Sequence, residues 1–180
     1  MVSSAEGPSV CGEGRSDPHE LVFRTVPPDV GDAAVLVTAM LTEMRELYWD
    51  LGGVASGGLD LDAPDMPKAG PAELGPPAGT FLVGYRGGVA VCCGGLKRLP
   101  DGACEIKRMY VLPEARGHGV ARRLLHALED AARGLGYRVS RLDSGPRQPH
   151  ATGLYDSEGY LPVENFNDNP VATYFGEKHL

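Results

Sequence analysis

One stretch of the chain, residues 104–136, combines a buried strand, a glycine-containing turn and an amphipathic helix. Residues 105–112 (EIKRMYVL) carry apolar, aromatic and β-branched side chains typical of a strand. In the turn that follows, residues 116–121 read RGHGVA, and from Val120 apolar residues recur at helical spacing. Gly136 stands where glycine commonly ends a helix. The sequence therefore predicts a strand that passes almost directly into a helix.

This arrangement predicts an anion-binding site at the start of the helix. The first N–H groups of a helix have no partners within it, and the helix dipole adds partial positive charge there. Gly117 and Gly119 leave the backbone open to close approach by a ligand. Arg116, Arg122 and Arg123 add positive charge around the same turn. We interpret the turn as a site for a diphosphate.

Three known diphosphate-binding motifs differ in their spacing. A P-loop requires Gly-x-x-x-x-Gly-Lys-Ser/Thr, and the chain contains neither Lys-Ser nor Lys-Thr. A Rossmann fingerprint that began at Gly117 would need a glycine where Arg122 stands. The third motif, Gln/Arg-x-x-Gly-x-Gly/Ala, is matched by Arg116, Gly119 and Ala121. In this motif the chain resembles the GNAT superfamily of acyl-coenzyme A dependent N-acyltransferases.

A second stretch of the sequence strengthens this resemblance. GNAT proteins commonly carry Asn-x-x-Ala-x-x-Leu-Tyr-x-x-x-Gly-Phe, downstream of the first motif. The corresponding residues here are Gln148, Ala151, Leu154, Tyr155, Gly159 and Tyr160. Gln148 keeps an amide in place of Asn, and Tyr160 keeps an aromatic ring in place of Phe. The resemblance covers about residues 20–180 and is most specific over residues 104–160.

The first half of the chain predicts a strand, a helix and a hairpin. Residues 20–26 alternate as a strand does, and apolar residues from Ala33 to Leu47 predict a helix, with Asp29 or Asp32 as its cap. The segment 51–77 is rich in Gly and Pro and predicts a long loop. In GNAT proteins this region forms part of the wall of the site that binds the acetyl acceptor. Two apolar runs flank Arg86-Gly87-Gly88 and predict a hairpin whose second strand lies beside strand 105–112.

The second half adds strands over residues 138–143, 160–163 and 171–177, with a short helix over 150–158. The crossover helix before strand 138–143 predicts that this strand lies parallel to strand 105–112. The resemblance implies an α/β (α+β) fold with a mixed, mostly antiparallel sheet of six to seven strands. About four helices would flank this GNAT-like sheet, with one parallel pair of strands at its centre.

Composition limits the domain count and the partners. A chain of 180 residues that is 42% hydrophobic predicts a single domain over residues 19–180, after a disordered tail over residues 1–18. No apolar run is long enough to cross a membrane and the N-terminus lacks secretory features, so we expect a cytoplasmic protein. The net charge of -7 argues against a nucleic-acid partner. Residues 107–147 nevertheless carry nine Lys or Arg against four Asp or Glu, which suits a polyanionic cofactor.

The cysteines and histidines show no metal-ligand spacing. We therefore expect no metal, and we interpret Cys11, Cys92, Cys93 and Cys104 as reduced thiols. His118, within the glycine turn, is interpreted as a spacer that contributes its backbone.

The resemblance implies that acetyl-coenzyme A is the co-substrate. The residues that it places at this molecule are Met109, Tyr110, Val111, Arg116, Gly117, His118, Gly119, Val120, Ala121, Arg122, Gln148 and Tyr155.

The resemblance also implies a set of catalytic roles. Tyr155 would protonate the departing thiolate, and Glu105 would take a proton from the amine, with Glu43, Glu46 and Asp50 as alternative bases. A backbone N–H near Met109 or Val111 would stabilise the oxyanion if the central strands splay apart.

For the acceptor, the sequence favours a small cationic amine. Glu43, Tyr48 and Trp49 are predicted to contact it, because acidic and aromatic groups together hold cations. The predicted function is transfer of an acetyl group from acetyl-coenzyme A to a primary amine of a small molecule, by direct attack in a ternary complex. Acetylation of a protein at Lys or its N-terminus, and a non-catalytic acyl-coenzyme A sensor, remain alternatives. A homodimer is expected only by analogy with the family.

Overall fold

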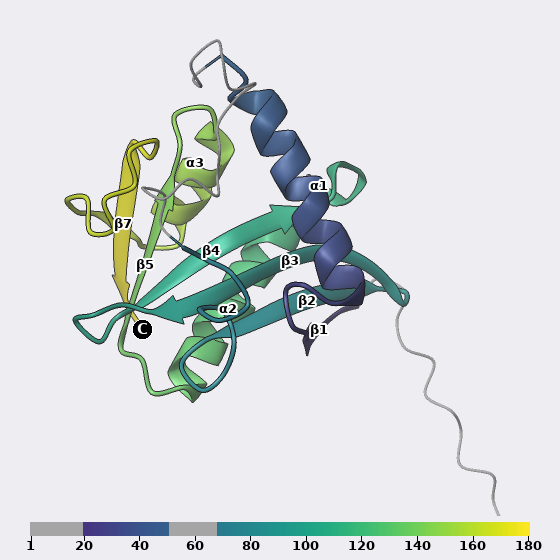
Figure 1. Cartoon of the computed structure of the whole chain (residues 1–180), viewed down its shortest axis with the longest axis horizontal. Coiled ribbons are helices and arrows are strands. Elements are labelled where there is room, and N and C mark those ends of the chain that lie inside the picture. Colours follow the sequence, from purple (N-terminus) through teal and green to yellow (C-terminus); the bar gives the residue numbers. More distant parts are fainter. Residues whose placement is uncertain (1–19, 51–67) are drawn as a thin grey trace, which may run out of the picture.

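The computed structural model describes residues 20–50 and 68–180. The tail predicted over residues 1–18, and residues 51–67 of the predicted long loop, lie outside the described residues. The described residues form a seven-stranded sheet in the order β1-β2-β3-β4-β5-β7-β6 (Figure 1). The strands are β1 Leu21–Thr25, β2 Thr80–Arg86, β3 Val89–Arg98, β4 Cys104–Val111, β5 Val139–Ser144, β6 Leu161–Pro162 and β7 Tyr174–His179. Every neighbouring pair is antiparallel except β4 and β5, so the predicted mixed sheet with one central parallel pair is confirmed.

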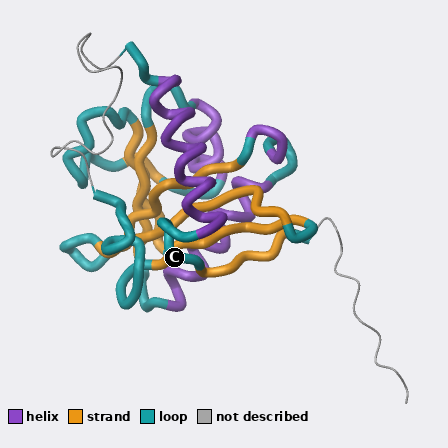
Figure 2. Tube along the Cα trace, turned by 45° about the vertical axis from the view of Figure 1, so that its right-hand side comes forward, coloured by secondary structure: helices purple, strands orange, loops and turns teal. Residues whose placement is uncertain are grey.

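Three α-helices pack around this sheet within the described ranges, together with one short 3-10 helix, close to the four helices expected. They are α1 Gly31–Leu47, α2 Val120–Gly134, α3 Pro149–Ser157 and the 3-10 helix η1 Pro113–Ala115. Helix α1 crosses one face of the sheet and α2 lies behind the other (Figure 1). Figure 2 shows the same strands passing between the helices from a second direction. The sheet is therefore covered on both faces.

Alternating residues of the strands pack into two separate hydrophobic cores, one on each face of the sheet. On β2, Phe81 and Val83 pack with α1, whereas Leu82 packs with α2 on the opposite face, as the two-residue period of a strand requires. Cys92 and Cys93 divide in the same way, as the sequence predicted. Burial raises the pKa of each of these two thiols to about 12, so both remain protonated at neutral pH.

Helix α1 begins without the predicted acidic cap. Its N-cap residue is Val30, and no side chain caps the helix there. Asp32 instead lies in the first turn, where its carboxylate suits the positive end of the helix dipole and accepts a hydrogen bond from the Tyr85 hydroxyl at 3.0 Å. The cap assigned to Asp29 or Asp32 was wrong because Asp32 falls inside the helix and binds a neighbouring strand.

The central strands separate after a very short parallel pairing. Only Cys104 with Ser140 and Glu105 with Arg141 are in register between β4 and β5. Further along β4, Lys107 pairs with Gly95 of β3 and Tyr110 with Cys93, so two β4 residues lie opposite one residue of β3. This β-bulge and the divergence of β5 together open the sheet towards the carboxyl ends of both strands.

Candidate active site

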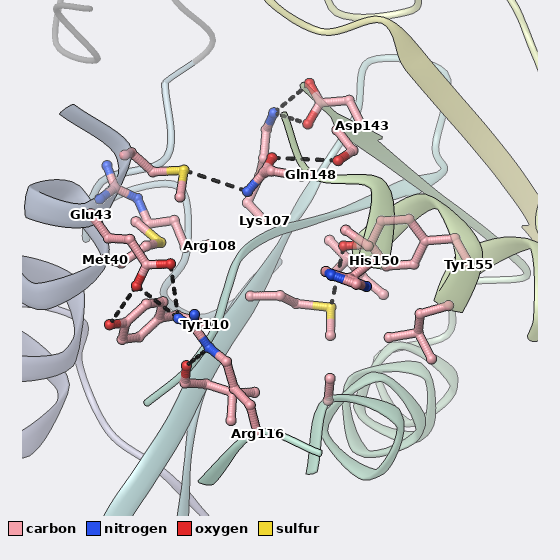
Figure 3. Close-up of a pocket in the computed structure, with 18 of the residues that line it drawn as sticks. Met40, Glu43, Lys107, Arg108, Tyr110, Arg116, Asp143, Gln148, His150 and Tyr155 are labelled. Atoms are coloured by element: carbon pink, nitrogen blue, oxygen red, sulfur yellow. Dashed lines mark hydrogen bonds and ion pairs between the residues drawn. The ribbon is translucent and has the colours of Figure 1, made fainter. Parts of the chain in front are cut away.

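A cavity of about 1100 Å³ lies at this opening of the sheet. Its walls come from α1, from β4, from the turn before α2, from the end of β5 and from α3. Figure 3 shows side chains from these elements converging on one space, with Glu43 on the α1 side and Tyr155 on the α3 side. The sequence segments singled out for their motifs therefore meet in a single site.

The glycine turn presents unblocked backbone to this cavity. Gly117 and Gly119 have φ angles of 78° and 72°, and a Cβ atom at either position would meet no heavy atom within 4 Å. Gly119 is the N-cap of α2, and no side chain caps the helix there. The first N–H groups of α2 are thus available to an anion, which is the geometry that a diphosphate requires.

Most of the residues predicted to contact the cofactor line the cavity. Met109, Tyr110, Val111, Arg116, Gly117, Gly119, Val120, Ala121, Arg122, Gln148 and Tyr155 do so. His118 is not among the described residues of the lining; its Nδ1 lies 2.7 Å from the carbonyl oxygen of Arg116. The role of His118 as a spacer stays a prediction.

The Arg116 side chain faces α1. Its guanidinium forms an ion pair with Glu43 at 2.7 Å and also donates from Nε to the carbonyl oxygen of Val111 at 2.9 Å. The hydrogen bond from Arg116 lowers the pKa of Glu43, outweighing its partial burial. The Tyr110 hydroxyl donates a further hydrogen bond to the same carboxylate at 3.1 Å. Glu43 is therefore an ionised cavity residue held by two partners.

The phenol of Tyr155 is enclosed between the sheet and α3. Only 6% of the residue is exposed, and its ring stacks on Tyr174 with centroids 6.2 Å apart. Its hydroxyl lies 3.9 Å from the sulfur of Met109 in the bulged strand. Burial, aided by the charge of Asp143, raises the pKa of Tyr155 well above its usual value. The phenol is consequently protonated at neutral pH and can act as a proton donor.

Glu105 lies where β4 and β5 are still paired, just before the two strands separate. It is fully buried, and its carboxylate contacts Lys97 at 3.1 Å and Lys107 at 2.9 Å. It is not among the described residues that line the cavity. The resemblance gave Glu105 the role of the base, but in the structure Glu105 lies in the paired segment of β4 and β5, outside the described lining of the cavity.

A buried ion pair that we did not predict joins the two diverging strands. Lys107 of β4 lies 2.8 Å from Asp143 of β5, and both residues line the cavity. Asn167 and Asn169 each donate to the same oxygen of Asp143 at 2.8 Å. Burial alone would raise the pKa of Asp143, but the charge of Lys107 and these hydrogen bonds hold it below its usual value. The sequence did contain one signal for this ion pair: Lys107 and Asp143 carry opposite charges on two strands that were predicted to lie parallel.

The aromatic pair expected at the acceptor lies elsewhere. Tyr48 is buried, and its hydroxyl accepts a hydrogen bond from the backbone N–H of Arg147 at 3.3 Å. Trp49 is 70% exposed beyond the end of α1. Neither residue is among those described that line the cavity, whereas Glu43, predicted with them, is.

Within residues 20–50 and 68–180, no cluster of three His, Cys, Asp or Glu side chains could hold a metal ion. A search of the same residues finds no helix with the length and apolar character needed to cross a membrane.

The model of the Acetyltransferase (GNAT) family matches residues 41–160, which include the glycine turn, both diverging strands and Tyr155. The chain belongs to the GNAT family. It is thus an acyltransferase, and its uncapped turn and enclosed tyrosine lie within the matched region.

Individual GNAT relatives agree with this assignment. An "IAA acetyltransferase" of Azospirillum brasilense is 36% identical over 104 residues, covering 56% of this chain and 67% of the relative. An uncharacterized N-acetyltransferase of Schizosaccharomyces pombe is 30% identical over 151 residues, covering 81% of this chain and 85% of the relative. The crystal structure of a GNAT acetyltransferase from Elizabethkingia anophelis with acetyl-CoA bound has a TM-score of 0.61 at 14% identity, covering 89% of this chain and 98% of that one. The last likeness shows a shared fold.

Proposed function

We propose that this GNAT protein transfers an acetyl group from acetyl-coenzyme A to the primary amine of a small molecule, in a ternary complex. The observation that carries the proposal is the single cavity that joins the uncapped start of α2 to the protonated phenol of Tyr155. Acetyl-coenzyme A would supply an acetyl group activated as a thioester.

The backbone amides that open α2 would bind the diphosphate of this co-substrate. Gly117 and Gly119 fit this role because open space surrounds the position of each missing Cβ. Arg122, at the third position of α2, lines the cavity and adds positive charge beside the amides. The bound acetyl-CoA in the Elizabethkingia neighbour supports this use of the fold.

We propose Glu43 as the carboxylate that receives the proton of the attacking amine, directly or through water. Of the four carboxylates that the sequence offered as bases, Glu43 is the one among the cavity-lining residues. Its lowered pKa means that it is ionised, and so able to accept a proton, across the neutral range. Glu105, engaged by two lysines, would instead hold the closed end of the sheet.

Two further groups would act on the acyl carbonyl and on the leaving thiolate. The β-bulge places an extra residue in β4 near Met109, and such a residue is left out of the regular ladder. Its backbone N–H would stabilise the negative charge that develops on the carbonyl oxygen. Tyr155 would donate its phenolic proton to the departing sulfur.

Release of free thiol from acetyl-coenzyme A in a screen of small amines tests this function. We expect thiol release to depend on the amine and the acetylated amine to appear in equal amount. Thiol release from lysine-bearing peptides alone, or coenzyme A binding without turnover of any amine, would contradict the proposal.

A further inference from the structure

Helix α1 carries an apolar stripe from the core of the protein into the cavity. Leu36, in the first half of the helix, is 2% exposed and packs in the core on that face of the sheet. Further along, Leu41, Met44 and Leu47 line the cavity and are only partly buried. Met40 lies between the two regions, because it is buried in the core and also lines the cavity. We call Met40, Leu41, Met44 and Leu47, which lie three and four residues apart on one side of the helix, the α1 wall.

The α1 wall lies on the side of the cavity that the proposed co-substrate site leaves open. Acetyl-coenzyme A is assigned above to the start of α2 and to Tyr155. Figure 3 shows Met40 and Glu43 together on the α1 side, across from Tyr155 on the α3 side. Glu43, the proposed proton acceptor, precedes Met44 by one residue and Leu47 by one helical turn. An amine that reaches Glu43 therefore has the rest of its molecule beside the α1 wall.

The lysine, arginine and carboxylate side chains of the described lining already have partners within the protein. The ion pairs are those of Lys107 with Asp143 and Glu105, Arg116 with Glu43, Arg147 with Asp50, and Arg122 with Glu158. Arg108 has an interaction partner in the protein as well. A second charged group on the acceptor would thus lose its water without meeting an unmatched opposite charge among the described lining residues.

The reacting amine itself does not conflict with this balance. It attacks in its neutral form, after its proton has passed to the carboxylate of Glu43. An apolar group beside that amine would bury its surface against the α1 wall, which contributes affinity of about fourfold for each methylene group. The thioethers of Met40 and Met44 would pack equally well against an aromatic ring.

We infer that the acceptor is a primary amine whose remaining part is apolar and uncharged, an alkylamine or an arylalkylamine. The inference rests on the proposed function and makes its substrate class specific. The amine would lie beside Glu43, and the apolar part would extend along the helix past Met44 to Leu47. A single ammonium agrees with the small cationic amine expected from the sequence, whereas the matched charges of the lining disfavour diamines and amino acids.

Three amines with the same aminopentyl chain test the inference by thiol release from acetyl-coenzyme A. Hexylamine, 1,5-diaminopentane and 6-aminohexanoate differ only in the group at the far end of the chain, which is a methyl, an ammonium or a carboxylate. We expect the wild-type kcat/KM to be about tenfold or more higher for hexylamine than for either of the others, because a buried end group without a partner is penalised. Propylamine, which covers less of the α1 wall, should also fall about tenfold or more below hexylamine.

The variant Leu47→Gln places a polar amide in the α1 wall with a side chain of similar size and helix propensity. We expect the ratio of kcat/KM for hexylamine to that for propylamine to fall about fivefold or more. This ratio is taken within one variant, so any loss of folded protein cancels. Leu47→Met should keep the ratio because the side chain remains apolar. Val35→Gln is the matched control on the same helix, since Val35 is 67% exposed and lies outside the described lining.

Equal or higher kcat/KM for 1,5-diaminopentane or for 6-aminohexanoate would overturn the inference and leave the proposed function intact. An unchanged ratio in Leu47→Gln, or the same fall in Val35→Gln, would overturn the role of the α1 wall. Absence of thiol release with these amines and with every other small amine would instead refute the proposed function, and the inference with it.

Discussion

Arg116 donates two hydrogen bonds from one terminal nitrogen to Glu43, at 2.9 Å to Oε1 and 2.7 Å to Oε2. These contacts join the turn before α2 to the helix that walls the opposite side of the cavity. The arginine that matches the GNAT motif therefore binds a carboxylate of this chain with its side chain, while the glycine turn that follows it is the proposed diphosphate site.

Replacing each of two carboxylates should separate their roles. We expect Glu43→Gln to lower kcat/KM by about tenfold or more, because the cavity loses its proposed proton acceptor and the partner of Arg116. Glu105→Gln should lower the stability of the fold while the folded protein keeps nearly normal turnover. Steady-state rates combined with urea unfolding distinguish the two effects. A large loss of turnover in a folded Glu105→Gln protein would instead indicate that Glu105 is the general base.

Tyr155→Phe removes the proposed proton donor and leaves the ring in place. We expect kcat to fall about tenfold or more, while coenzyme A binds with near wild-type affinity in calorimetry. Tyr85→Phe is a suitable control, because it deletes a hydroxyl that contacts Asp32 outside the cavity lining. If both variants turned over amines at the wild-type rate, Tyr155 would have no part in proton transfer.

Gly119→Ala tests the diphosphate site. A side chain at φ 72° strains the backbone by about 1–2 kcal/mol and places a methyl group among the amides that open α2. We expect coenzyme A affinity to fall about tenfold or more, measured by calorimetry. Gly102→Ala imposes similar strain at φ 89°, in the turn between β3 and β4, and should leave that affinity unchanged. Equal affinities in the two variants would argue against the site.

Asp143→Asn should destabilise the fold strongly. Removing the Asp143 carboxylate breaks a buried ion pair and leaves Lys107 with Glu105, a carboxylate that Lys97 also contacts, at a cost of up to about 3–5 kcal/mol in the free energy of unfolding. Since the folded pKa of Asp143 lies below its unfolded value, its contribution is complete above the unfolded pKa, near 3.9. The contribution is then lost as the pH falls through the folded pKa. Urea unfolding from pH 3 to 7 should show the wild type and variant converging in acid, and a constant difference would contradict this account.

The parts of the fold that depend on local signals could be predicted from the sequence. The strand, turn and helix over residues 104–136 are confirmed because apolar periodicity and the two glycines act within a few residues of one another. The hairpin around Arg86-Gly87-Gly88 is confirmed for the same reason.

The parts that depend on distant contacts could not be predicted. Glu105 is shielded because it lies within the short parallel pairing of β4 with β5, and no local sequence pattern specifies where two strands separate. The left-handed backbone of Arg108 follows from a register shift against β3, which its own neighbours in sequence do not encode. Tyr48 is buried and contacts Arg147, 99 residues further along the chain, whereas its neighbour Trp49 is exposed.

Only two residue pairs join β4 to β5 in parallel register, and they form a narrow connection, here called the seam, across the middle of the sheet. On one side of the seam lie α1 and the first four strands, and on the other lie β5 to β7. Past the seam, the two halves are tied by the salt bridge from Lys107 to Asp143. A substrate lodged between the halves would therefore strain side-chain ion pairs, Lys107 with Asp143 and Arg147 with Asp50, rather than backbone hydrogen bonds between β4 and β5.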